Sequence, residues 1–77
     1  MATVKILERR LGSPCSEMLD RVRSMEQKVK GVFPDAEFML VIGSDDALYL
    51  RVYSSDESMR GVIELVEDDL DRFRTDH

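Results

Sequence analysis

Five consecutive apolar residues, 38–42 (FMLVI), constrain the fold of this 77-residue chain more than any other segment. A turn cluster at 43–46 (GSDD) follows them, and a second strand-like run spans 47–53 (ALYLRVY). Two such runs joined by a short turn predict an antiparallel β-hairpin. The first run has no polar face, which is typical of a strand that is covered on both sides. A short chain has little material for a second cover, so the pattern indicates cover by a second subunit or a partner.

Length and composition predict a single domain spanning 1–77 and limit the kinds of site that it can contain. Cys15 is the only cysteine, so an internal disulfide is excluded. His77, the only histidine, is the last residue, and we therefore expect no metal site and no cofactor. The chain has no apolar run of membrane-spanning length, and residues 1–12 lack the apolar core of a signal peptide. We expect a cytoplasmic protein that makes no membrane contact.

Charge is distributed unevenly along the chain. Residues 1–30 carry seven basic and four acidic side chains, whereas 31–53 carry four acids against Arg51 alone. Residues 54–77 carry eight acids and three arginines, so the net charge of −5 is a property of the C-terminal segment. Such asymmetry can orient a partner, although a solvated helix face is the plainer interpretation.

A first helix is predicted after residue 12. Ser13 has the side chain of an N-cap, Pro14 suits the first helical position, and Gly31 suits the residue after the last turn. Between them, apolar residues recur at helical spacing: Cys15, Met18, Leu19, Val22, Met25 and Val29.

A second helix is predicted from a capping box formed by Ser54 and Glu57. Its apolar stripe consists of Met59, Val62, Ile63, Val66, Leu70 and Phe73, and its acidic face of Glu64, Glu67, Asp68 and Asp71. Leu65 widens the stripe and suggests a contact. Gly61 costs about 1 kcal/mol inside a helix, which indicates close approach of the first helix or of a partner, or a glycine tolerated without purpose.

Residues 3–11 fit both a strand and a helix face. We favour a strand over 3–8, because the Gly12-Ser13-Pro14 sequence then makes a natural break before the first helix. The predicted fold is therefore a small α+β domain with the order β-α-β-β-α. A right-handed crossover places both helices on one face of an antiparallel-rich three-stranded sheet, which is a split βαβ arrangement without its final strand.

The hairpin then has two unlike faces. Leu48, Leu50 and Val52 alternate with Tyr49, Arg51 and Tyr53, so the two sets point to opposite sides of the sheet. If the leucines face the helices together with Phe38, Leu40 and Ile42, the opposite face displays Met39, Val41, Tyr49, Arg51 and Tyr53. This composition is typical of the centre of a protein interface.

Three uses of this face are open. The first is a homodimer, formed by packing two sheet faces or by pairing two edge strands. The second is a different protein partner, with the chain as a small subunit, adaptor or inhibitor. In that case the acidic helix would meet a basic surface through Glu64, Leu65, Glu67, Asp68 and Asp71.

The third use is single-stranded nucleic-acid binding by stacking on Tyr49 and Tyr53, with Arg51 between them. The glycine- and aromatic-rich signature of such platforms is missing, and a net charge of −5 opposes phosphate binding. We therefore keep nucleic-acid binding as the alternative to protein binding.

An enzymatic role would depend on Cys15, whose place in the first helical turn favours a reactive thiolate and a redox function. The chain offers no CxxC motif and no histidine base besides the terminal one. Cys15 also begins an apolar stripe, so we expect a buried, inert side chain. The glycines are isolated, so no phosphate loop is formed, and Asp45-Asp46 is expected to turn the chain. We predict a non-enzymatic interaction module.

Overall fold

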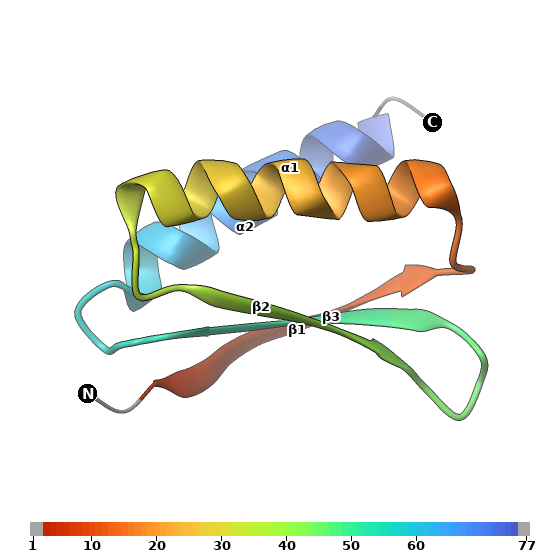
Figure 1. Cartoon of the computed structure of the whole chain (residues 1–77), viewed down its shortest axis with the longest axis horizontal. Coiled ribbons are helices and arrows are strands. Elements are labelled where there is room, and N and C mark those ends of the chain that lie inside the picture. Colours follow the sequence, from red (N-terminus) through yellow and green to blue (C-terminus); the bar gives the residue numbers. More distant parts are fainter. Residues whose placement is uncertain (1–2, 76–77) are drawn as a thin grey trace.

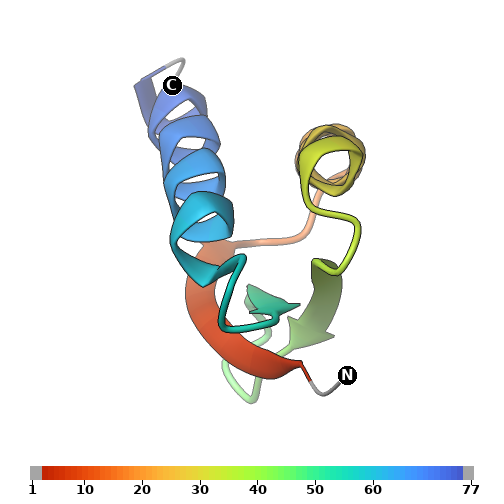
Figure 2. The same ribbon diagram turned by 90° about the vertical axis from the view of Figure 1, so that its left-hand side faces the viewer.

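The computed structural model describes the backbone of residues 3–75 and the side chains of residues 3–72. Its elements are β1 (Val4–Gly12), α1 (Ser16–Val32), β2 (Glu37–Ile42), β3 (Leu48–Ser54) and α2 (Met59–Thr75). The sheet order is β1-β3-β2, with the central β3 antiparallel to both neighbours (Figure 1). Both helices lie on the same face of the sheet (Figure 2). The predicted α+β fold and its β-α-β-β-α order are confirmed.

The hydrophobic core lies between this face and the two helices. Along β3, every second residue is buried and those between are half-exposed. The side chains that close the core are fully buried: Val29 of α1, Leu50 and Val52 of β3, and Val62 and Val66 of α2. Full burial of each such side chain is worth about 1.5–3 kcal/mol, so these contacts fix the helices to one side of the sheet.

β1 is a strand, as predicted, but it is longer than expected and irregular. It continues past residue 8 to Gly12, which has a φ of 98°. Its pairing with β3 shifts register between Lys5 and Leu7 and again between Arg10 and Gly12. The two skipped residues, Ile6 and Leu11, pack against the core. β1 therefore contains two bulges, each at an apolar residue that packs against the core.

The predicted start of the first helix is wrong. α1 begins at Ser16, with Cys15 as an N-cap in extended conformation (φ −151°, ψ 159°), while Ser13 and Pro14 lie outside the helix. Because β1 runs to Gly12, the next residues are needed to carry the chain from the sheet to the helix layer. Cys15 is exposed, which contradicts the expected buried side chain.

Leu19 is 39 % exposed and so departs from the expected apolar stripe, whereas the other members that follow Cys15 are buried. The predicted end of α1 is also wrong. Gly31 lies within the helix, and the backbone N–H of Phe33 donates to the Val29 carbonyl at 2.7 Å to close the last turn.

Gly61 of α2 faces the ring of Phe33. A Cβ atom at this glycine would lie 2.3 Å from Phe33 Cζ, a distance that no real Cβ contact shows. The expectation that Gly61 permits a close approach is therefore confirmed, and the approaching group is the residue that caps α1.

α2 begins at Met59, so the predicted capping box is wrong. Ser54 is instead the fully buried last residue of β3. The turn before α2 is held by Asp35, whose carboxylate accepts hydrogen bonds from the Ser55 hydroxyl (2.7 Å), the Ser55 backbone N–H (3.0 Å) and the Ser58 hydroxyl (2.9 Å). These bonds, those of Ser55 above all, lower the pKa of Asp35 to about 2. The side chain of Phe73 and all of His77 lie outside the described residues.

Candidate interaction surface

The sheet face turned away from the helices is the surface that the sequence singled out. We call it the open face. Its members, read from the strand register, are Lys5, Glu8 and Arg10 of β1, Glu37, Met39 and Val41 of β2, and Tyr49, Arg51 and Tyr53 of β3.

The register confirms the predicted assignment of the hairpin side chains to two opposite faces of the sheet. Met39 lies opposite Arg51 and Val41 opposite Tyr49, and directly opposed residues of an antiparallel pair share a face. Leu40 lies opposite Leu50, on the face that carries the helices. All five candidates of the hairpin, four apolar or aromatic residues and Arg51, are therefore brought together on the open face.

The charged residues of β1 were not predicted to lie on the open face. Glu8 lies opposite Arg51, with 3.5 Å between Oε1 and Nε, and its Oε1 also accepts a 2.8 Å bond from Lys5 Nζ. The hydrogen bond from Lys5, supported by Arg51, lowers the pKa of Glu8. Opposite charges three residues apart, at Lys5 and Glu8, were the available signal, but only a bulge places them on one face of a strand.

A second polar cluster joins the hairpin turn to the open face. Asp45 Oδ2 accepts bonds from the Tyr49 hydroxyl (2.9 Å) and Arg10 Nε (3.2 Å), and Asp45 Oδ1 accepts one from the Ala47 backbone (3.2 Å). The Tyr49 hydroxyl is the main cause of the lowered pKa of Asp45, and the same bond raises the pKa of Tyr49. Asp46 adopts a φ of 61°, so the expectation that these aspartates turn the chain is confirmed.

The open face is electrically balanced. Lys5, Arg10 and Arg51 are matched by Glu8 and Glu37 and by Asp45 reaching in from the turn. The chain as a whole carries −5, so its excess negative charge lies elsewhere. A second molecule approaching the open face meets little long-range repulsion.

The free edge of β2 is the most apolar exposed segment that the structure describes. Met39 is 48 % exposed on the open face, and Leu40 and Ile42 are 38 % and 55 % exposed on the helix side. Figure 1 shows the reason: the hairpin end of β2 runs away from α1, which leaves that end uncovered. Large apolar residues gathered at an uncovered edge are typical of an interaction site.

The acidic helix is a weaker candidate than the sequence indicated. Glu67 Oε2 of α2 accepts a 2.6 Å bond from Arg9 of β1, and Asp68 pairs with Arg72 at 3.2 Å. Leu65 packs against the core. Glu64 and Asp71 are exposed on α2. Part of this helix face is thus committed to contacts within the chain.

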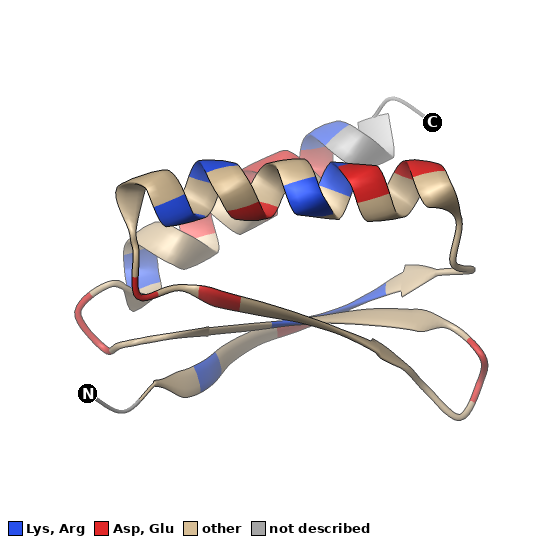
Figure 3. Ribbon diagram, viewed as in Figure 1, with Lys and Arg blue, Asp and Glu red and all other residues tan. Residues whose placement is uncertain are grey.

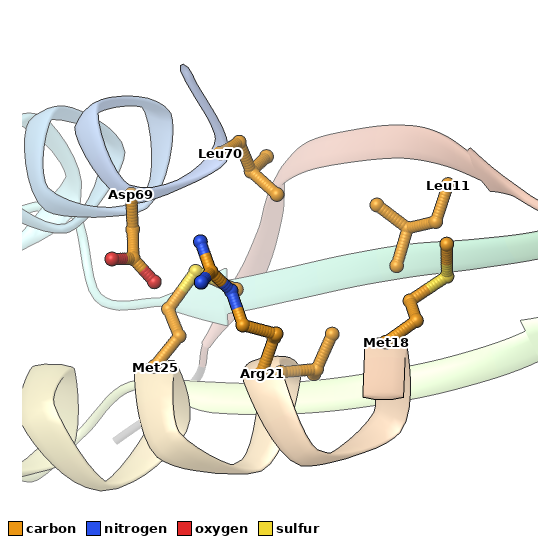
Figure 4. A pocket seen from close by; sticks show the side chains of 7 residues that line it. Leu11, Met18, Arg21, Met25, Asp69 and Leu70 are labelled. Atoms are coloured by element: carbon orange, nitrogen blue, oxygen red, sulfur yellow. The ribbon is translucent and has the colours of Figure 1, made fainter. Parts of the chain in front are cut away.

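A shallow cleft, partly open to solvent, lies between the two helices near the end of β1. Figure 4 shows Arg21 of α1 and Asp69 of α2 reaching toward one another at one end, and Leu11 and Met18 at the other. Its remaining lining is Val22, Met25 and Leu70. The enclosed space has room for about one water molecule, far less than a small ligand needs, so we assign this cleft to helix packing.

Two further observations concern only the described residues. They contain no group of three or more histidine, cysteine or acidic side chains placed to hold a metal ion. Neither helix, as far as it is described, is long and apolar enough to cross a membrane.

Comparisons with known protein families, with curated proteins and with solved structures find no match for this chain.

Proposed function

We propose that this chain is a non-enzymatic protein-interaction module that binds its partner through the uncovered side of its sheet. The observation that carries this proposal is that Met39, Val41, Tyr49, Arg51 and Tyr53 lie together on the face without helices. One partner of this surface is a second copy of the chain, which makes the protein a homodimer.

The chemistry of the open face supports a protein partner. Methionine, tyrosine and arginine are enriched at the centres of protein interfaces, where their large side chains supply most of the binding energy. Met39 offers a flexible apolar side chain, 48 % exposed, at the edge of the face. Arg51 forms a 3.5 Å ion pair with Glu8 through its buried Nε atom. A pair between such partly exposed side chains is worth about 0–1 kcal/mol, so a partner carboxylate can compete for the guanidinium group.

Nucleic-acid binding is less well supported by the same face. The Tyr49 hydroxyl is tied to Asp45, and the basic side chains of the face are matched by acids. Affinity for a polyanion rests on unmatched lysine and arginine. We expect no single-strand binding at physiological salt, as fluorescence anisotropy with a labelled oligonucleotide would show.

The proposal is tested by a pair of methionine variants. Met39 on the open face and Met59 on α2 are 48 % and 40 % exposed, so Met39→Asp and Met59→Asp introduce the same charge at similarly exposed sites. The full chain and each variant are immobilised and used to capture proteins from a lysate of the source cells. Free wild-type chain is added to the lysate, so that binding of a second copy is measured in the same experiment. We expect wild type and Met59→Asp to retain a common protein, and Met39→Asp to lose it.

Retention of the same proteins by Met39→Asp, or loss by both variants alike, would contradict the proposal. Circular dichroism of both variants confirms that the comparison is made between folded chains.

A further inference from the structure

The two edges of the sheet are protected very differently. β1 carries two bulges and the charged residues Lys5, Glu8, Arg9 and Arg10, which are the devices that keep an edge strand from pairing with another chain. β2 pairs with β3 without a register shift, and Glu37, at its start, is its only charged residue. Figure 3 shows the same contrast, with charges recurring along β1 and one acidic position on β2. The β2 edge is therefore the one open to pairing.

The backbone groups that β2 presents to this edge can be identified. The N–H of Gly43 donates to the Ala47 carbonyl at 2.9 Å. In an antiparallel ladder, alternate residues bond to the neighbour strand and those between direct their N–H and C=O outward. With Gly43, Val41 and Met39 bonded toward β3, the outward groups belong to Phe38, Leu40 and Ile42. These three positions are symmetric about Leu40.

We infer that β2 pairs antiparallel with β2 of a second copy, with Leu40 of each chain facing Leu40 of the other across a two-fold axis. This inference rests on the proposed function: it takes a second copy as the partner and adds a contact at the β2 edge, beside the open face. In this register, Phe38 lies opposite Ile42 of the other copy, so every outward N–H and C=O of the edge finds an acceptor or donor. The two sheets join into one, with all helices on the same side.

The side chains fit the same register. Met39 lies opposite Val41 of the second copy on the open face, while the leucines and the Phe38–Ile42 pairs meet on the helix side. The exposed areas of Met39, Leu40 and Ile42 are thereby removed from water. Glu37 lies opposite Gly43 of the second copy, so no like charges are paired within the strand.

Other registers of the two β2 strands leave some of the outward N–H and C=O groups unpaired. A shift that places Phe38 opposite Leu40 puts Ile42 against Ala36, which is fully buried within its own chain. The opposite shift, with Ile42 opposite Leu40, puts Phe38 against Ser44 in the hairpin turn. Only the register centred on Leu40 pairs all three outward residues of β2 with one another.

The experiment uses charge at the symmetry axis. Sedimentation equilibrium should give wild type a mass twice the 8.9 kDa of one chain. Leu40→Lys and Leu40→Glu each place like charges face to face, so each alone should give the mass of one chain. An equimolar mixture of the two should recover the doubled mass, because residue 40 of one chain then meets the opposite charge. Val4→Lys, at an apolar and 50 % exposed position on the β1 edge, should remain dimeric.

Circular dichroism checks folding. If the Leu40 variants do not fold, Ile42→Lys, at a position 55 % exposed in the single chain, replaces them and should be monomeric. A dimer of either Leu40 variant alone, or a mixture of the two that stays monomeric, would overturn the edge pairing. The proposed function would then still be tested by the capture experiment with Met39→Asp. A wild-type chain that is monomeric at high micromolar concentration would overturn the second copy as partner.

Discussion

At the scale of single residues, the contact between Gly61 and Phe33 shows how α2 is seated against the end of α1. The Phe33 ring occupies the space that a side chain at residue 61 would need. A glycine inside a helix costs about 1 kcal/mol relative to alanine, so the ring contact offsets a loss of helix propensity. Gly31, within α1, provides a natural comparison, because a Cβ atom there would meet nothing within 4 Å.

The two glycines should therefore respond in opposite ways to the same substitution. Gly31→Ala should raise the free energy of unfolding by roughly 0.4–1 kcal/mol, because it restricts the unfolded chain and favours the helix. Gly61→Ala should leave the protein less stable than Gly31→Ala by roughly 1–3 kcal/mol, because the packed ring must move. Urea unfolding of both variants measures the difference. Equal stabilisation by the two would show that the Phe33 ring is not held in place.

At the scale of elements, Asp35 connects the turn after α1 to the turn before α2. Its pKa lies at about 2 in the folded chain, below the value of 3.8 for an unperturbed aspartate. A carboxylate whose pKa is depressed by folding stabilises the native state while it is ionised. That contribution is complete above pH 4 and is lost as the pH falls from about 4 toward 2.

Asp35→Asn should remove this pH dependence. We expect the variant to be less stable than wild type at pH 7, because an amide is a weaker acceptor for Ser55 and Ser58 than a carboxylate. The difference should narrow as the pH is lowered from 4 to 2. Urea unfolding at several pH values measures it, with Asp56→Asn, an exposed carboxylate in the turn that Asp35 holds, as the matched control. An Asp35→Asn variant whose stability falls in parallel with wild type would rule out Asp35 as the source.

The hairpin was predictable from sequence because its signals are local and strong. The apolar run 38–42, the turn and the alternation from Leu48 to Val52 set both the register and the face of each residue. The helices were predictable as elements but not at their starts. Ser13 and Ser54 have the chemistry of caps, but neither caps a helix. Ser54 pairs with Val4 and is buried at the end of β3, and Ser13 lies in the crossover because β1 runs to Gly12; a local pattern contains neither fact.

The charged part of the open face was not predictable by alternation. Strict period-two spacing places Lys5 and Glu8 on opposite faces of β1. The bulge at Ile6 changes the parity, so both residues reach the open face and contact one another. The bulge depends on how Ile6 and Leu7 pack against helices that are distant in sequence, and this packing was not visible in the local pattern.

At the scale of the whole molecule, the chain separates its charge from its exposed apolar surface. The described side chains of α2 include five acids and two arginines, on the side of the sheet opposite to the balanced open face. The charged and bulged β1 edge closes one side of the sheet, and the apolar β2 edge leaves the other open. Both asymmetries favour the place that we propose for the partner, which is the open face and the β2 edge beside it.

Hydrogen exchange of the β2 backbone measures pairing at the β2 edge in the native sequence, because it needs no substitution. In dilute solution, the N–H groups of Phe38, Leu40 and Ile42 should exchange rapidly, while those of Met39 and Val41, bonded toward β3, should exchange slowly. At high micromolar concentration, the three outward groups should become protected as the edge is paired. Unchanged exchange at Phe38, Leu40 and Ile42, or new protection on α2 in their place, would contradict the account.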